Sequence, residues 1–206
     1  MSDIRRLMER LEADDVGGLH LGGNAGLRLF LQHADPRVLT FEEGEPTNPS
    51  NERVSTYVSI LPTHANSIVL LLYPMTERVG FSGIALQLNV PRNAFNQADE
   101  EALRKIGMSP GRCHPFPDPR LVSDDGIDLM FMERTMLSDD AQYNFPVYSP
   151  IQDERDQLLY VTGGDRIGSV YMSPVYYLEN MQRLVGPDKI RPLHIVKREE
   201  PFVTVG

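Results

Sequence analysis

The segment from Gly107 to Asp128, GMSPGRCHPFPDPRLVSDDGID, gathers more groups capable of chemistry than any other stretch of the sequence. Cys113 is the only cysteine of the chain and stands directly before His114. Three carboxylates follow, at Asp124, Asp125 and Asp128. A thiol beside an imidazole could supply a nucleophile and its base, and the carboxylates could hold Mg²⁺ or Ca²⁺ through oxygen ligands.

The spacing of these groups argues against both kinds of site. Catalytic cysteine and histidine residues come from distant parts of a fold, and neighbours in an extended loop point apart. A cysteine outside a disulfide mostly behaves as a small apolar side chain, so we interpret Cys113 as structural or incidental. Asp124-Asp125-Gly126 before an apolar run is ordinary turn chemistry, and the glutamate of a calcium-binding loop is missing. We therefore assign no catalytic residue, no metal ligand and no cofactor.

Other catalytic and binding motifs are also missing from the sequence. The glycine-rich runs at 22–26 and 162–169 match neither a dinucleotide fingerprint nor a Walker loop. The five histidines are scattered singly, without the i, i+4 spacing of a helical metal site. A small divalent-metal-dependent hydrolase that uses the Cys113–Asp128 loop remains the alternative function.

Composition narrows the remaining function classes. The chain has 206 residues, a formal net charge of −9 and a hydrophobic fraction of 41%, which allows a packed core. An acidic surface without a run of Lys and Arg disfavours nucleic acid as a partner. The N-terminus is charged throughout, and the most apolar run, at 67–73, is far shorter than the roughly 20 residues that span a bilayer. We expect a soluble, cytoplasmic, acidic protein with no membrane contact.

The element that stands first in the chain is predicted to be an amphipathic helix over residues 1–15. Its apolar positions have the i, i+3, i+4, i+7 spacing of one helix face, at Ile4, Leu7, Met8 and Leu11. Arg5 and Arg6 lie on the opposite face. A glycine-rich connection over 16–26 follows, so the helix either folds back onto its own domain or docks on a partner. For the docking case, we predict that these six residues form the partner-binding surface.

Residues 27–206 are predicted to form a single α+β domain. Strand-length runs bounded by turn residues occupy 27–32, 37–43, 53–61, 67–73, 82–90, 127–134, 157–163 and 166–172, with two short strands near the end of the chain. Helices are expected at about 97–106 and, between the Ser173-Pro174 start and the Gly186-Pro187 stop, over the last strongly amphipathic segment. Regular βαβ alternation is lacking, so we predict a largely antiparallel sheet with two or three helices packed on one face or edge.

A chain with an ample core and no convergent site suggests a function in binding. We predict a non-enzymatic protein–protein interaction protein: an adaptor, an accessory or chaperone-like factor, an inhibitor, or a structural subunit of an assembly. Tyr, Met and Pro residues gather between Met130 and Tyr177, and Tyr and Met suit adaptable interfaces. The alternative for these residues is that they fill the core. The expected partner is another protein or a second copy of this chain.

Overall fold

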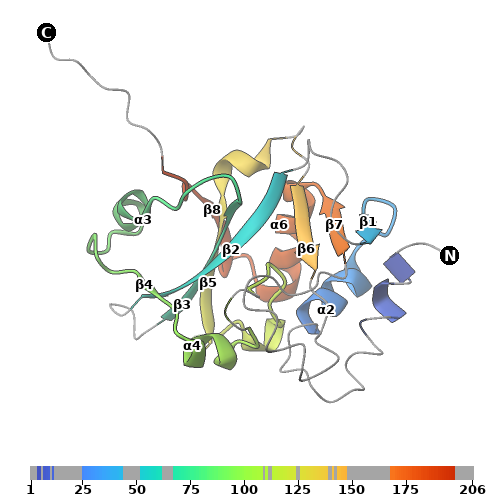
Figure 1. The fold of residues 1–206 in the computed structure, drawn as a ribbon, viewed down its shortest axis with the longest axis horizontal. Helices are drawn as coiled ribbons and strands as arrows, with labels where there is room; N and C mark the ends of the chain where they lie inside the picture. The colour runs from blue at the N-terminus through green and yellow to red at the C-terminus, as the bar shows by residue number, and fades with distance from the viewer. Residues whose placement is uncertain are drawn as a thin grey trace, which may run out of the picture.

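The described part of the chain folds around one mixed β-sheet. The computed structural model describes residues 4–5, 7–9, 11, 25–43, 52–61, 67–108, 110, 113–123, 126–138, 141, 143–147 and 168–197. Within these residues eight strands form the sheet, and its order is β1-β7-β6-β2-β3-β5-β8, with β4 paired to β2 (Figure 1). The predicted α+β class is confirmed.

The strand bounds follow the sequence closely in the centre of the sheet. The strands are β1 (Thr40–Glu43), β2 (Glu52–Leu61), β3 (Ser67–Pro74), β4 (Asn96–Gln97), β5 (Ile127–Glu133), β6 (Tyr143–Val147), β7 (Gly168–Met172) and β8 (Ile190–Leu193). The pairs β1·β7, β2·β3, β2·β4 and β6·β7 are antiparallel, whereas β2·β6, β3·β5 and β5·β8 are parallel. The sheet is therefore mixed, and the prediction of a largely antiparallel sheet needs this correction.

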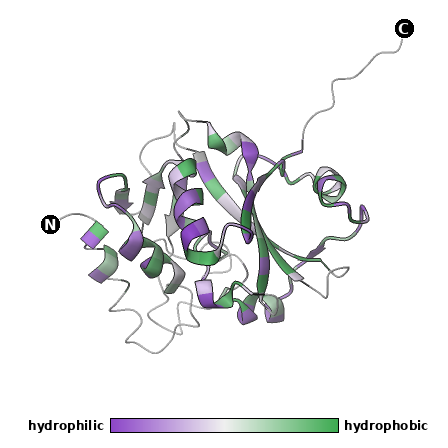
Figure 2. Cartoon of the chain, turned by 180° about the vertical axis from the view of Figure 1, so that it is seen from behind, coloured by the Kyte–Doolittle hydropathy of each residue, from purple (hydrophilic) through white to green (hydrophobic). Residues whose placement is uncertain are grey.

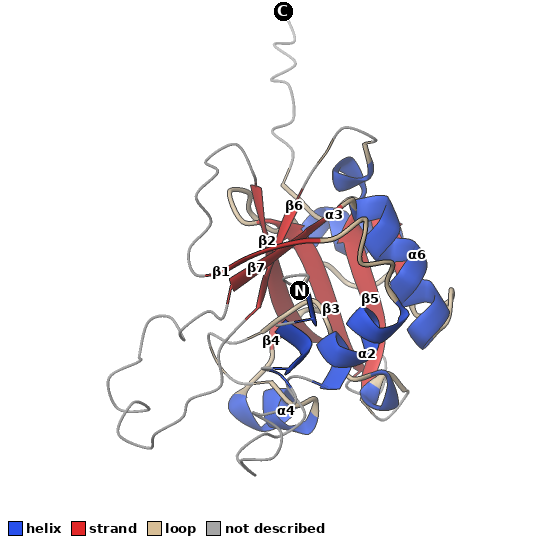
Figure 3. Ribbon diagram, turned by 90° about the vertical axis from the view of Figure 1, so that its right-hand side faces the viewer, coloured by secondary structure: helices blue, strands red, loops and turns tan. Residues whose placement is uncertain are grey.

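Helices lie on both faces of the sheet. They are α2 (Ala25–His33), α3 (Phe81–Leu88), α4 (Glu100–Lys105) and α6 (Pro174–Val185), with short 3-10 turns η2 (Pro119–Leu121) and η3 (Arg134–Leu137). Apolar side chains of α2, α4 and α6 join the larger core cluster on one face, where α2 and α6 lie together (Figure 3). Ile84 of α3 belongs to a second cluster on the other face. The prediction that the helices pack on one face or edge is therefore corrected, because they pack on both faces.

Burial in the central strands explains the sequence pattern. In β3 seven of the eight residues are buried, because the strand is covered on both faces, as its continuous apolar run predicts. Helix α6 carries both hydrophilic and hydrophobic residues and buries Tyr177 and Met181 (Figure 2). It begins with Pro174 after Ser173 and ends before Gly186, whose φ of 101° suits glycine. The prediction for this helix is confirmed.

Two predicted strands are helices. Residues 27–32 belong to α2, where Leu27, Phe30 and Leu31 are buried at helical spacing, and residues 82–88 belong to α3. Strand β6, which contains Pro146, is not among the strands predicted from the sequence. Its pairing with β2 involves only Tyr143 and Asn144, so the missing N–H of the proline falls beyond that ladder.

Some predictions concern residues outside the described part of the chain. These are the glycine-rich connection up to residue 24, the strand at 157–163 and the last residues after 197. The helix predicted at about 97–106 is confirmed as α4 from Glu100 on, whereas Asn96 and Gln97 pair with β2 as β4. The Asp99 side chain caps α4 by accepting a hydrogen bond from the Ala102 N–H. No helix among the described residues has the length and apolar character needed to cross a membrane.

Candidate functional site

The Cys113-His114 pair is partly buried, and Cys113 packs against the larger core cluster. Burial raises the pKa of the Cys113 thiol to about 11, so the thiol stays protonated at neutral pH and is a poor nucleophile. Burial lowers the pKa of His114 to about 4, and its ring is therefore neutral. The backbone N–H of Phe116 lies 3.3 Å from Nδ1 of His114. This arrangement supports the structural interpretation of Cys113.

The loop around this pair closes one end of the larger core. Phe116 is fully buried and its ring lies 5.1 Å from Phe30, 5.6 Å from Tyr177 and 5.9 Å from Phe145. The Tyr177 hydroxyl donates a hydrogen bond to the carbonyl of Pro115. The prolines of the loop therefore set a path that inserts an aromatic ring between α2, α6 and β6.

The carboxylates predicted as the alternative metal site are only partly described. Asp124 and Asp125 lie outside the described residues. Asp128 lies in β5, and its Oδ1 is 3.3 Å from Nζ of Lys189. Among the residues that the structure describes, no group of three or more His, Cys, Asp or Glu side chains could hold a metal ion. The hydrolase alternative stays a prediction.

The N-terminal helix packs against its own domain. The described residues between Ile4 and Leu11 are helical, and Ile4, Leu7 and Leu11 are buried in the larger core cluster, with Met8 packed against it. Arg5 is exposed and its Nε lies 3.5 Å from Glu9 Oε1, whereas Arg6 lies outside the described residues. A partner could reach the predicted binding face only if the helix left the core.

The described residues of the methionine- and tyrosine-rich segment mostly fill the interior. Buried side chains from it are Met130, Met132, Met136, Tyr143, Phe145, Tyr171, Met172 and Tyr177. This is the alternative that the sequence left open. The part of this segment that the structure describes, which excludes 148–167, therefore offers little of the aromatic surface expected of an interface.

A different apolar surface is exposed, on α3. Among the described residues the large apolar side chains that are exposed are Leu86 at 83%, Met75 at 56% and Val38 at 49%. Leu86 lies on α3, which buries Ile84 and Ala85 against the sheet. Next to Leu86 the helix surface is open, because a Cβ added to Gly83 would meet no atom within 4 Å. The geometry singles out this helix as the candidate site.

The residues that precede α3 are hydrogen-bonded to the residues that follow β8. The backbone N–H of Gly80 donates to the carbonyl of Ile195 at 2.7 Å, and the N–H of Lys197 donates to the carbonyl of Arg78 at 2.7 Å. Val79 and Val196 form the antiparallel bridge between these bonds. A Cβ at Gly80 would lie 3.0 Å from Cα of Lys197, so glycine permits the close approach.

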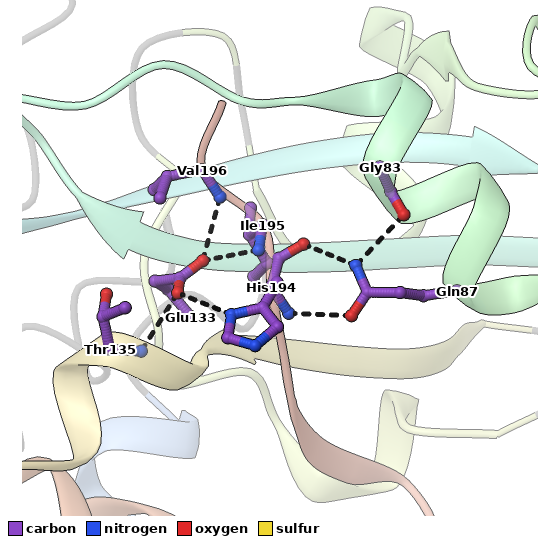
Figure 4. A network of polar contacts seen from close by, with 7 residues as sticks. All are labelled: Gly83, Gln87, Glu133, Thr135, His194, Ile195 and Val196. Carbon is purple, nitrogen blue, oxygen red and sulfur yellow. Dashed lines mark hydrogen bonds and ion pairs between the residues drawn. The ribbon is translucent and has the colours of Figure 1, made fainter. Parts of the chain in front are cut away.

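The middle of α3 is held by Gln87. Its Nε2 donates to the carbonyls of Gly83, at 3.0 Å, and His194, at 2.8 Å, and its Oε1 accepts from the His194 N–H at 3.2 Å (Figure 4). The side-chain amide thereby replaces a strand partner for His194. Helix α3 is fixed to the chain beyond β8 both before its first turn and near its last.

Glu133 also holds the residues that follow β8. It stands at the end of β5, is fully buried, and its carboxylate accepts backbone N–H bonds from Thr135, Ile195 and Val196 (Figure 4). Burial disfavours the charged carboxylate, but these bonds outweigh that effect and lower the pKa of Glu133 below its ordinary value. His194 Nδ1 lies 3.7 Å from Oε1, with its side chain 34% exposed.

Sequence reasoning missed this arrangement. Gln87, Glu133 and His194 are far apart in the chain and form no motif, and only the folded sheet brings them together. One available signal was Glu133 itself, because a carboxylate that ends an apolar strand and precedes a turn needs hydrogen-bond donors nearby.

Comparisons with known proteins leave the function open. No protein-family model matches the chain, and no curated protein matches its sequence. Two solved structures resemble it at 10% identity and a TM-score of 0.49. One comes from work on computational grafting of linear epitopes onto scaffold proteins, with 87% of this chain and 96% of that chain covered. The other is a protein proposed to be a trans-editing enzyme for prolyl tRNA synthetase, with 85% and 98% covered. Likeness at this level carries no argument about function.

Proposed function

We propose that this protein is a non-enzymatic binding protein that contacts another protein through the exposed surface of α3, centred on Leu86. The observation that carries the proposal is the exposure of Leu86, whose side chain is 83% accessible on a helix otherwise rich in apolar residues. A single exposed apolar residue is ordinary. The exposed positions around it, Ser82, Gly83 and Gln87, are small or polar and would form the rim of the contact. Phe81, Leu88 and Val90 pack against the second core cluster and support the helix, and Gly83 leaves room for a partner side chain.

The fixed position of α3 supports a role in recognition. Binding is strongest when the contacting surface is already ordered in the unbound protein, because less conformational entropy is lost. The Gly80 bonds and the Gln87 bonds hold the helix at two points. The helix would therefore present Leu86 without first having to fold.

The expected partner is a protein with an apolar pocket that accepts a leucine side chain. Burying a leucine contributes about 1.5–3 kcal/mol, which corresponds to roughly a 10- to 150-fold change in the dissociation constant. Leu86 would thus act as the anchor of the contact. The substitution Leu86→Glu would place an unpaired carboxylate in the partner's pocket, so it should weaken binding more than truncation of the side chain to alanine.

The test compares Leu86→Glu with Val38→Glu. Val38 is a matched control because it is also an exposed apolar residue, but it precedes β1, at the opposite end of the sheet from β8 (Figure 1). Proteins cross-linked to the wild type in native extract would be identified and purified, and their dissociation constants measured by calorimetry. We expect Leu86→Glu to weaken binding at least tenfold and Val38→Glu to change it less than twofold.

Two outcomes would count against the proposal. A purified partner that binds the Leu86→Glu variant as tightly as the wild type would place the interface elsewhere. Concentration-dependent dimerisation of the wild type that Leu86→Glu abolishes would instead identify a second copy of the chain as the partner. Both variants should keep the urea midpoint of the wild type, because both side chains are exposed in the folded state.

A further inference from the structure

Cationic side chains gather around α3 in a chain that is acidic as a whole. Segments 75–97 and 190–197 contain α3, the residues that flank it, β8 and the residues that follow β8. Together these segments hold four Lys or Arg side chains and one carboxylate, a formal charge of +3, so the remaining residues must carry −12 to give the total of −9. Helix α3 lies at the end of the molecule opposite the N-terminal helix (Figure 1). The four cations are all exposed, and we call them the cationic cluster: Arg78, Arg92, Arg191 and Lys197.

Arg92 lies beside the exposed side of α3. Its Nε donates a hydrogen bond to Oγ of Ser82 at 2.8 Å. Ser82 and Leu86 are four residues apart in the helix and both exposed, so their side chains are neighbours on its surface. The guanidinium group is therefore held about one turn from Leu86. Its planar fork of N–H donors matches the geometry of a carboxylate.

Arg78 and Lys197 form a pair of like charges before the first turn of α3. The antiparallel bridge between Val79 and Val196 places these two residues opposite one another, and the Lys197 N–H donates to the Arg78 carbonyl at 2.7 Å. Val79 packs against the second core cluster, so the alternation of side chains turns both cations towards solvent. Like charges directly opposite one another are destabilising. Within the described part of the chain, no carboxylate forms an ion pair with either of them.

Arg191 completes the cationic cluster at the edge of the sheet. It lies in β8, the last strand in the sheet order, and is paired with Phe131 of β5. Its guanidinium carbon lies 5.2 Å from the centroid of the Phe131 ring, and Phe131 shares the second core cluster with Ile84 of α3. Arg191 therefore lies on the face of the sheet that α3 covers. The contact with the ring also holds the guanidinium group in place.

We infer that α3 recognises an acidic protein surface, in which carboxylates surround the apolar pocket for Leu86. This inference rests on the proposed function, whose site it shares. Carboxylates of the partner would neutralise the cationic cluster and remove the repulsion between Arg78 and Lys197. An acidic partner would be repelled by the rest of this chain, so charge would direct it to α3.

The charge pattern favours a protein over two other anionic partners. Duplex nucleic acid carries one charge per roughly 1.7 Å, so a bound duplex would extend past the four cations and meet the acidic remainder of the chain. An anionic lipid surface binds helices that expose a broad apolar side, whereas α3 exposes only Leu86 among its large apolar residues. A protein surface can instead offer a few carboxylates around one pocket of leucine size.

The first experiment measures the binding of a short oligoglutamate peptide to the whole chain by chemical-shift changes. At about 0.1 M NaCl the Debye length is about 10 Å, so distant charges are screened. We expect saturable changes confined to α3 and the cationic cluster, and at least tenfold weaker binding at about 1 M NaCl. Arg92→Glu should weaken binding at least about threefold, because one exposed ion pair contributes about 1.4- to 5-fold and charge reversal adds repulsion. Arg183→Glu is the matched control, since Arg183 is exposed on α6, on the other face of the sheet, and should change binding less than twofold.

The second experiment compares other occupants of the same surface. A DNA duplex, or vesicles of phosphatidylserine and phosphatidylcholine, that bind more tightly than oligoglutamate and lose binding in Arg92→Glu would overturn the inference. The combined variant Glu199→Gln, Glu200→Gln should bind oligoglutamate within twofold of the wild type. A gain of tenfold would instead show that carboxylates of this chain occupy the cationic cluster. Self-association that Arg92→Glu abolishes would assign the surface to a second copy, and either result would overturn the inference.

Failure of this inference can be told apart from failure of the proposed function. If oligoglutamate does not bind, or binds the wild type and Arg92→Glu equally, the acidic partner is refuted even where a purified partner still requires Leu86. A purified partner that ignores Leu86→Glu refutes the proposed function, and that result comes from a different variant and a different probe. In the expected case the purified partner loses affinity in both Leu86→Glu and Arg92→Glu, and only the Arg92 effect shrinks at about 1 M NaCl.

Discussion

Replacing Glu133 with glutamine tests how the candidate site is held together. The carboxylate accepts the Thr135 N–H at 3.0 Å on Oε1, and the Ile195 and Val196 N–H groups on Oε2, the latter at 2.9 Å. Glutamine has nearly the same shape but only one acceptor oxygen. It can keep the two bonds to the β8 extension only by turning its NH₂ group towards the Thr135 N–H.

The expected loss of stability follows from these three bonds. Hydrogen bonds to a charged acceptor contribute about 1.5–3 kcal/mol and neutral ones about 0.5–1.5 kcal/mol, so the two retained bonds lose about 1 kcal/mol each. Glu133 also caps η3 through the Thr135 N–H, and losing a cap costs about 0.5–2 kcal/mol. Glu133→Gln should therefore lower the free energy of unfolding by about 2–4 kcal/mol.

The pH dependence of the free energy of unfolding provides a second, independent test of the role of Glu133. Because the folded state lowers the pKa of Glu133 below its ordinary value of 4.5, the charged form stabilises the fold. This contribution is fully present above pH 4.5 and is lost as the pH falls through the folded-state pKa. The Glu133→Gln variant has no such group, so its deficit relative to the wild type should shrink as the pH falls below that value.

Urea denaturation of the wild type and of Glu133→Gln at several pH values between about 3 and 7 measures both effects. Glu179→Gln is the matched control, because Glu179 is exposed on α6 and should change the midpoint little. Amide hydrogen exchange at Ile195 and Val196 should also become faster in Glu133→Gln. A variant with the wild-type midpoint at pH 7 and unchanged exchange would refute the assignment of Glu133 as the group that holds this segment.

Three further predictions concern the core. Met181 is 1% exposed whereas Leu178 is only partly buried, so Met181→Ala should cost about 2–5 kcal/mol in urea unfolding and Leu178→Ala clearly less. Cys113, with its pKa near 11, should react at pH 8 about 100-fold more slowly with a disulfide reagent in the folded protein than after unfolding, as followed by absorbance. Deleting residues 1–15 should lower the melting temperature by at least about 5 °C, because the deletion removes three buried side chains; an unchanged value would revive the docking hypothesis.

The elements that were predictable carry their signals within a few residues. Helix α6 has a start at Pro174, a stop at Gly186 and an apolar face between them, and β3 is a continuous apolar run of strand length. Helices α2 and α3 were assigned to strands because nine and eight residues are close to strand length, and their apolar runs fit either period. Packing in the folded domain, and not the local sequence, determines that α2 and α3 are helices.

The candidate site could not have been predicted in the same way. The side-chain amide of Gln87 can bond to the backbone N–H and carbonyl of His194 only because the residues after β8 lie beside α3. No local sequence pattern encodes that proximity. Strand register likewise places Asn144 beside Arg53 across the parallel pair of β6 and β2, and no local pattern encodes this neighbour. The loop that looked most reactive in sequence, around Cys113, was instead shaped by its prolines to fill the core.

The face of the sheet that α3 covers changes character along the strand order. Over β3, β5 and β8 the face is apolar, and Val69, Leu71 and Phe131 pack with Ile84 of α3. Over β1, β7 and β6 the same face carries Thr40, Glu42, Asn144, Ser169 and Tyr171. Strand β2 lies between the two halves in the sheet order. Because residues without shared partners act additively, the stability effects of Glu133→Gln and Asn144→Leu should sum in the double variant to within about 0.5 kcal/mol.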